Sequence, residues 1–359
     1  METLAWIGFT QSFFGALLLL AKRNNHISDK ILAAWLVVSA ITFFEVAISK
    51  AGSFSITPVN TMITNVLLYI YCLSVTNDKF RLKSVHFYHA LLPFIFVLII
   101  VWTGARLRMD HYFFDDVFLP YRIALAVCLI ASFFLYWYLS IKTIHRYRMH
   151  LKNEYSSIES NIKLGWLLFV LIFYIIFNLW LIAAGFIEVF SVIETNYVVY
   201  ILISNLFLVF AFIFYGLRQQ VLMPAHTDNT ETTTYAESKL SDEEKHRIAQ
   251  KLMLYFDTKQ PYLDRELTIS SLAAQLGTQR YKLTEVLNSE LHKNFYRFVN
   301  EYRIEKAKAM LTDRSNDKLS IEAIGYDCGF NSKTTFFTVF KSFTGLTPMQ
   351  YKTQISGKN

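Results

Sequence analysis

Seven stretches within the first 217 residues are each long and apolar enough to cross a lipid bilayer as a helix. Spanning the hydrocarbon core takes about 20 predominantly apolar residues. The stretches cover approximately residues 4–21, 31–49, 57–76, 87–104, 120–141, 164–186 and 195–217. The sequence therefore predicts that residues 1–217 form a polytopic transmembrane helix bundle of about seven spans.

The distribution of charge separates this apolar part from the rest of the chain. Overall, 53% of the residues are apolar, and charged residues are sparse before Arg218 but frequent after it. The net charge of +7 is mild and is divided between the two parts. It therefore indicates neither a nucleic acid nor an anionic membrane surface by itself. One part of the chain is suited to lipid and the other to water.

A polar, Thr-rich segment broken by Pro224 connects the two parts. Such a composition cannot bury a core, so residues 218–240 are predicted to be a linker. The segment ends at Ser241, and Glu244 follows three residues later. This spacing is typical of a capping box, in which the two side chains satisfy backbone amides at a helix start. A separate domain is therefore predicted over residues 241–359.

Basic residues are concentrated in alternate loops of the apolar part. One set of loops contains Lys22, Arg23, Lys30, Lys79, Arg81, Lys83, Lys142, Arg146, Arg148, Lys152 and Lys163, whereas the other set contains only Lys50, Arg106, Arg108 and Arg122. Loops rich in Lys and Arg remain on the cytoplasmic side. An odd number of spans then predicts an N-terminus outside and a C-terminal domain in the cytoplasm.

The polar part contains the same helical pattern twice. Residues 267–290 and 319–343 each read as a short helix, a turn containing Gly277 or Gly329, and a second helix, which is helix-turn-helix spacing. Between them, residues 295–312 form a predicted linker helix. Its predicted inward positions are Phe295, Phe298, Tyr302, Ala309 and Leu311. A rigid helix between two such units would let both recognition helices enter the major groove about one turn of DNA apart. The predicted fold class is all-α.

Longer motifs in the same region identify a family resemblance. The pieces that carry it are LAAQLGT, NFYRFVNEYRIEKAKAML, SIEAIGYDCGFNSKTTFF and VFKSFTGLTPMQYK. Residues 267–351 resemble the tandem helix-turn-helix domain of the AraC/XylS transcriptional regulators. The resemblance covers the last quarter of the chain, and the whole layout is similar to membrane-integrated AraC-like regulators of bacteria. It implies promoter binding by a multi-pass protein of the bacterial inner membrane.

Four positions depart from the family pattern. Gln279 stands where the family usually has a capping Ser, and His292 stands where it has a Gly. Gly325 replaces a small Ala, and Thr338 replaces a frequent Arg on the second recognition helix. Fewer charged base contacts predict looser sequence selectivity, with more weight on phosphates and DNA shape.

Placement by the motif predicts which side chains face DNA. The candidates for base contact are Tyr281, Lys282, Thr284 and Glu285 on the first recognition helix, and Lys333, Thr334 and Thr338 on the second. Arg280 and Lys341 are better suited to phosphate, as are backbone amides near Ser332. A lone Lys would more simply be a solvated charge. Phe336 and Phe340 are predicted to be core, whereas Phe337 is left open.

A few polar residues lie inside the apolar stretches, where they are costly and often functional. They are Glu45, Asn65, Asn178 and Asn205. The Asn residues are expected to form hydrogen bonds between helices, and Glu45 is the candidate for signal sensing. The apolar stretches contain no acid–base pair, metal-ligand spacing or nucleophile constellation, and neither part of the chain contains a phosphate-binding Gly loop, so neither enzymatic activity nor a cofactor is expected.

Three classes of function fit the two-part chain to different degrees. The favoured hypothesis is a membrane-embedded one-component transcriptional regulator, with promoter DNA, lipid and an unknown signal ligand as partners and a homodimer as the default assembly. The alternative is a small-molecule transporter or channel with a regulatory helical tail, but paired buried charges and Gly- or Pro-broken spans are largely missing. An integral-membrane enzyme has no supporting motif.

Overall fold

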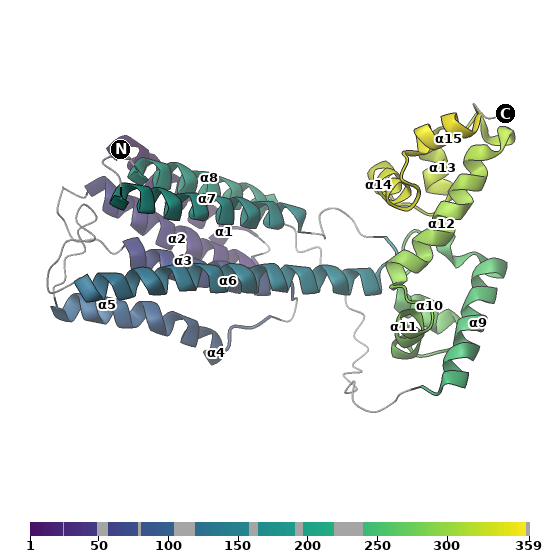
Figure 1. Ribbon diagram of the computed structural model, residues 1–359, viewed down its shortest axis with the longest axis horizontal. Helices are drawn as coiled ribbons and strands as arrows, with labels where there is room; N and C mark the ends of the chain where they lie inside the picture. Colours follow the sequence, from purple (N-terminus) through teal and green to yellow (C-terminus); the bar gives the residue numbers. More distant parts are fainter. Residues whose placement is uncertain are drawn as a thin grey trace. The chain divides into compact units, whose positions relative to one another are not determined.

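The structure is a computed structural model, drawn in Figure 1. It describes residues 1–23, 25–48, 57–77, 80–103, 119–157, 164–190, 197–218 and 240–356. The chain divides into two compact units, which are Met1–His145 with Leu164–Ala225, and Arg146–Lys163 with His226–Asn359. Residues 219–239, nearly all of the predicted linker, lie outside the described part.

The first unit is built from helices. In chain order they are α1 (Glu2–Leu20), α2 (Ile27–Ile48), α3 (Thr57–Val75), α4 (Ser84–Phe87), the short 3-10 helix η1 (Tyr88–Ala90), α5 (Leu91–Thr103), α6 (Leu119–Glu154), α7 (Gly165–Phe190) and α8 (Tyr197–Arg218). Helix α2 packs against α1, α3 and α8, and α8 also packs against α1 and α7. Helix α6 starts in this unit, and its residues from Arg146 onward belong to the second unit.

The described part contains five helices that are long and apolar enough to cross a membrane. They are Glu2–Leu20, Ile27–Ile48, Thr57–Val75, Leu119–Glu154 and Val199–Arg218. Two shorter apolar helices, Ser84–Ile99 and Gly165–Trp180, lie where the fourth and sixth apolar stretches were predicted. Several long apolar helices are therefore confirmed, while the number of spans stays a prediction.

Helix α1 illustrates how the first unit distributes its side chains. Its buried face consists of small residues and one leucine, at Ala5, Gly8, Ser12, Gly15, Ala16 and Leu19. Large apolar side chains point outward instead, with Phe13 49% and Phe14 61% exposed. Small residues at a helix contact allow close approach of the backbones, which is typical of helices packed in lipid.

In the second unit, α9 and the first helix-turn-helix share a core. Helix α9 (Asp242–Lys259) is followed by the 3-10 helix η3 (Pro261–Leu263), and α10 (Ile269–Gln275) and α11 (Arg280–Ser289) form the helix pair. Gly277 lies between α10 and α11 with a φ of +61°, a left-handed conformation that glycine adopts without steric cost. The core of this half includes Leu252, Phe256, Leu272, Leu283, Leu287 and Phe298.

The second half of this unit repeats the arrangement. Helices α13 (Ile321–Asp327) and α14 (Lys333–Thr344) form the second pair, η4 (Arg314–Asn316) precedes them, and α15 (Pro348–Ser356) follows. The core of this half is Ile304, Ala307, Leu311, Ile324, Cys328, Phe330, Phe336, Val339 and Phe340. The two predicted core phenylalanines, Phe336 and Phe340, are thus confirmed.

Helix α12 (Phe295–Thr312) joins the two pairs and coincides with the predicted linker helix. It contacts α11, α13 and α14, and Figure 1 shows it running between the two pairs. Phe295 and Leu311 face inward as predicted, but the prediction for Ala309 was wrong because this residue is exposed. Ala307 is buried in its place, since it lies one turn from Leu311 on the same helix face.

All regular elements in the described ranges are helical, so the predicted all-α class is confirmed there. An isolated antiparallel bridge joins Tyr155 to Thr268. This bridge belongs to the second unit, because the structure groups residues Arg146–Lys163 with the C-terminal residues. The prediction from sequence includes this segment in residues 1–217, the apolar part.

Candidate nucleic-acid interface

The second recognition helix, α14, presents a polar face built on a helical repeat. Thr334, Thr338 and Lys341 are all exposed and are spaced by four and three residues, which places them on one side of the helix. Lys333 is exposed as well, and its Nζ lies 3.6 Å from Glu322. An ion pair this exposed is weak and gives way easily to another partner.

The start of α14 is held by Ser332. Its Oγ accepts a hydrogen bond from the backbone N–H of Thr335 at 3.2 Å, so the hydroxyl serves as an N-cap. Phe337, which was left open, is partly buried and packs against the second core. The Nζ of Lys333 lies 5.9 Å from the centre of its ring.

On the first recognition helix, α11, the charged candidates Lys282 and Glu285 form ion pairs with another helix. Lys282 Nζ lies 2.7 Å from Glu244 Oε1, and Glu285 Oε1 lies 3.6 Å from Lys245 Nζ. Both partners come from α9, which packs against α11. The bond to Glu244 raises the pKa of Lys282 above its ordinary value.

The beginning of α9 explains why Glu244 reaches α11. Ser241 Oγ accepts the N–H of Glu244 at 3.2 Å, which is one half of the predicted capping box. The carboxylate of Glu244 instead binds Lys282. Ser241 therefore caps α9, whereas Glu244 contributes to the packing of α9 against α11.

The remaining candidates on α11 lie near its first turn. Gln279 occupies the N-cap without a side-chain hydrogen bond, as expected for a poorer cap. Arg280 forms an ion pair with Glu154, the last residue of α6, and partial burial lowers the pKa of Arg280. Tyr281 and Thr284 are partly buried, and the hydroxyl of Thr284 donates to the backbone carbonyl of Arg280 at 3.0 Å.

A buried cation, Arg303, lies at the centre of the second unit and was missed by the sequence analysis. Its side chain on α12 is 0% exposed. Burial lowers its pKa to about 10, which still leaves the guanidinium charged near neutral pH. The missed signal was periodicity, because Arg303 lies one turn from both Val299 and Ala307 on the inner face.

The polar residues of the first unit hold helices together. Thr57 Oγ1 on α3 donates to Glu45 Oε2 on α2 at 3.1 Å, and the Tyr174 hydroxyl on α7 donates to Asn65 Oδ1 on α3 at 2.6 Å. The prediction of hydrogen bonding between helices is thus confirmed for Asn65. The amide of Asn178 instead donates within its own helix, to the carbonyl of Tyr174 at 2.8 Å.

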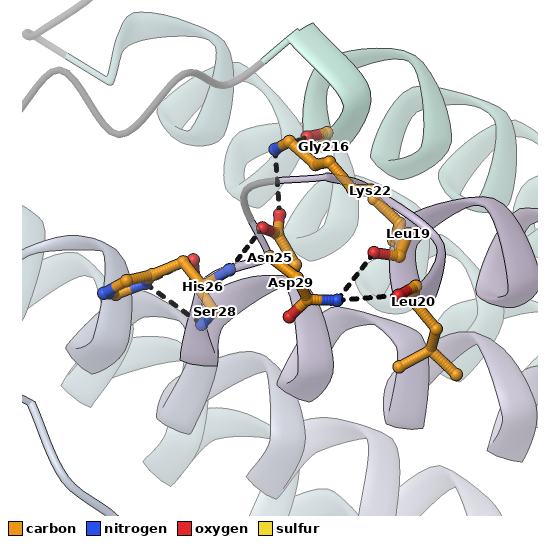
Figure 2. A network of polar contacts seen from close by, with 8 residues as sticks. All are labelled: Leu19, Leu20, Lys22, Asn25, His26, Ser28, Asp29 and Gly216. Atoms are coloured by element: carbon orange, nitrogen blue, oxygen red, sulfur yellow. Dashed lines mark hydrogen bonds and ion pairs between the residues drawn. The ribbon is translucent and has the colours of Figure 1, made fainter.

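A further polar cluster, shown in Figure 2, connects the α1–α2 turn to the end of α8. Lys22 Nζ lies 3.1 Å from Asp29 Oδ1 and 3.3 Å from the carbonyl oxygen of Gly216 in the last turn of α8. The backbone N–H of His26 donates to Asp29 Oδ2 at 2.9 Å. Because a cation is favourable near the C-terminus of a helix, this cluster has a structural role in fixing the end of α8.

Two helix pairs arranged about one connecting helix define a tandem helix-turn-helix protein. A match to a helix-turn-helix domain family covers residues 272–354. An uncharacterized HTH-type transcriptional regulator in the cgkA 5′ region of Pseudoalteromonas carrageenovora is 33% identical over 125 residues, which is 34% of this chain and 70% of that protein. The chain belongs to the helix-turn-helix transcriptional regulators, with a C-terminal domain of the AraC type.

More distant relatives match over a smaller share of their length. An uncharacterized HTH-type transcriptional regulator of Staphylococcus aureus (strain COL) is 30% identical over 32% of this chain and 14% of its own length. The HTH-type transcriptional regulator ArgR of Pseudomonas aeruginosa is 28% identical over 26% of this chain and 28% of its own. No solved structure matches the chain.

Proposed function

We propose that this transcriptional regulator is embedded in the bacterial inner membrane, senses a signal through its first unit and binds promoter DNA through its second. The observation that carries the membrane assignment is the outward-facing apolar surface of the first unit, including Phe13, Phe14, Ile176 and Phe210. Large exposed apolar surfaces mark contact with a membrane or a partner rather than with water. Lipid is the solvent that suits such helices.

The proposed topology follows from the loop charges and has an N-terminus outside and a cytoplasmic DNA-binding domain. The domain boundaries at residues 1–217 and 241–359 form part of the same proposal, with residues 146–163 grouped with the DNA-binding unit. Glu45 is the proposed signal-sensing residue, and a homodimer is the proposed assembly. A signal ligand acts by binding two states of the membrane part with different affinity, since a ligand with equal affinity shifts nothing.

The proposed DNA contacts combine bases and phosphates. Exposed Thr334 and Thr338 suit hydrogen bonds to base edges, whereas Lys341 and the amides at the start of α14 suit phosphate. On α11, Tyr281 and Thr284 are the uncharged candidates for base contact. Lys282, Glu285 and Arg280 would exchange their present ion pairs for DNA. The Arg280 side chain is 52% exposed, so its ion pair is weak and its exchange has a small cost, whereas the pairs of Lys282 and Glu285 are partly buried.

DNA binding by the full-length protein in lipid nanodiscs tests this function. Duplexes enriched from a random-sequence library serve as the probe, and affinity is measured across a salt series. Replacing Lys341 by alanine should reduce the slope of log affinity against log salt by about 0.9, the contribution of one lost phosphate contact. Lys259→Ala, an exposed lysine at the end of α9, is the control and should leave the slope unchanged. Absence of binding to any duplex would contradict the proposal.

The sequence preference of α14 is tested by Thr338→Arg. A bidentate arginine favours guanine and discriminates against other bases by about 1–3 kcal/mol. The enriched sequences should therefore shift at the position facing residue 338 and remain the same elsewhere. Repeating the library selection with the variant checks this prediction. An unchanged set of sequences would mean that this helix does not read bases.

The orientation is tested separately by a reporter fused after Gln220. A reporter active only in the cytoplasm should be active there, because the proposed topology places this point inside the cell. A fusion in the fourth loop between the apolar stretches, after Asp115, is the matched control and should give the opposite result. An exported reporter after Gln220 would exclude DNA binding by the tail in the cell.

A further inference from the structure

The peptide formed by residues 154–157, at the C-terminal end of α6, is bound by the DNA-binding unit as part of its fold. Tyr155 pairs with Thr268 in an antiparallel bridge just before α10. The next residue, Ser156, is 0% exposed. Its backbone N–H and its Oγ both donate to the carbonyl of Leu267, at 3.3 and 2.7 Å. These contacts join sequence positions more than a hundred residues apart within one compact unit.

The same peptide supplies most of the hydrogen-bond acceptors of buried Arg303. Nη1 donates to the Ser156 carbonyl at 3.2 Å and to Ser157 Oγ at 2.9 Å, and Nη2 donates to Ser156 Oγ at 3.1 Å. The remaining bonds go to the carbonyls of Tyr262 and Asp264, both at 2.7 Å. A buried charge must be hydrogen-bonded to be tolerated, so the peptide is an integral partner of this cation.

A neighbouring residue on α12 strengthens the same contact. Asn300, 1% exposed, donates from Nδ2 to the Ser156 carbonyl at 2.9 Å. Arg303 and Asn300 on the linker helix thus both donate hydrogen bonds to the main-chain carbonyl of Ser156. Main-chain hydrogen bonds of this kind are a recurring mode of peptide recognition.

The docked peptide also reaches the predicted DNA-contacting surface. Glu154 is the first residue of this peptide and forms an ion pair with Arg280, the first residue of recognition helix α11. The Arg280 side chain is 52% exposed, which leaves it accessible to a competing anion. A DNA phosphate would compete with the Glu154 carboxylate for the Arg280 guanidinium, because arginine forms charge-assisted hydrogen bonds with both anions.

We propose that residues 154–157 are an intramolecular ligand of the DNA-binding domain, and that the docked peptide keeps Arg280 from binding DNA phosphate. This proposal rests on the proposed function. Helix α6 runs from Leu119, in the first unit, to Glu154, so the docked residues follow directly on a helix that begins in the first unit. Release of Glu154 from Arg280 frees the guanidinium for DNA phosphate and raises DNA affinity, while the bonds of Ser156 to Arg303 are kept. The signal therefore reaches the first helix-turn-helix through the end of α6, in addition to the chain connection after α8.

A double-mutant cycle in the full-length protein in nanodiscs tests the proposal. The probe is a duplex enriched by the wild-type protein from a random-sequence library, titrated across a salt series. Glu154→Gln should bind about two- to five-fold more tightly, the range that an exposed ion pair supports. Its salt slope should be steeper by about 0.9, the contribution of one further phosphate contact. In an Arg280→Gln background the same substitution should have no effect, because coupling requires both partners.

The control separates this pairing from a general change in charge. Glu243→Gln removes an exposed carboxylate from the first turn of α9 and should change affinity equally with Arg280 or Gln at position 280. An unchanged affinity of Glu154→Gln, or an effect that persists in the Arg280→Gln background, would overturn the regulatory role.

Docking itself is measured by a cross-link. In a chain whose three cysteines are replaced by alanine, Tyr155→Cys and Thr268→Cys should form a disulfide, because bridged residues lie within its Cα span of about 4.4–6.8 Å. Failure of this cross-link would overturn docking. A wild-type chain that binds no duplex would overturn the proposed function, whatever the cross-link shows, so the two failures are distinguishable.

Discussion

Replacing Gly329 by alanine is expected to destabilise the second helix-turn-helix by about 3 kcal/mol. Gly329 has a φ of +88°, where a residue with a Cβ pays about 1–2 kcal/mol. A Cβ would also lie 2.4 Å from the carbonyl oxygen of Tyr262 and 3.0 Å from Leu263 Cα. Both are backbone atoms of η3, so the contact is relieved only by moving the chain, at a cost of about 1–3 kcal/mol.

Gly345 provides a matched control for the backbone term. It has a φ of +78°, and a Cβ added there meets no atom within 4 Å. Gly345→Ala should therefore lower the free energy of unfolding only by the cost of the left-handed conformation, about 1–2 kcal/mol. Hydrogen exchange of the α13 and α14 amides in the full-length protein measures both. Equal destabilisation by the two substitutions would show that the close approach of η3 to Gly329 has no energetic consequence.

The C-terminal helices were predictable because their ends are determined locally. Asn294 begins α12 by accepting the Arg297 N–H at 2.9 Å, and Ser332 begins α14 in the same way. Such caps involve residues only three apart, so they can be recognised in a sequence. The apolar periodicity between the caps then identified the buried phenylalanines of α14.

The features that escaped prediction depend on contacts between distant residues. Arg303 was not among the residues predicted to be buried, and its partner Ser156 lies 147 positions away in the chain. A serine in a basic loop carries no local sign that a buried guanidinium will bind its carbonyl. The same limit applies to Lys282, whose carboxylate partner on α9 was assigned only a capping role.

The division of the chain was predicted from composition, and composition misses short segments. Residues 146–157 are basic and follow an apolar stretch, so they were read as an ordinary cytoplasmic loop. The structure continues α6 to Glu154 and groups this segment with the DNA-binding unit. A polar segment can thus belong to either unit, and its hydrogen bonds decide which.

Replacing Arg303 by methionine is expected to destabilise the second unit by about 3 kcal/mol or more. The substitution roughly keeps the apolar stem but removes all five hydrogen bonds of the guanidinium. Buried acceptors then lose their donor, at about 1–3 kcal/mol for each group left unsatisfied. Because α12 contributes to both cores, amides in α10 and in α13 should exchange faster with solvent.

Arg297→Met is the matched control, since Arg297 is exposed on the same helix and surface substitutions usually change stability by less than about 0.5 kcal/mol. Arg303→Lys should be intermediate, because it keeps the charge but cannot bind two acceptors in the fixed geometry of a guanidinium. If the amides of α10 and α13 exchanged at the same rates in Arg303→Met and Arg297→Met, the buried cation would not stabilise the linker helix. A large difference at 303 would establish Arg303 as the residue on which the docking of the α6 peptide and the stability of the DNA-binding unit jointly depend.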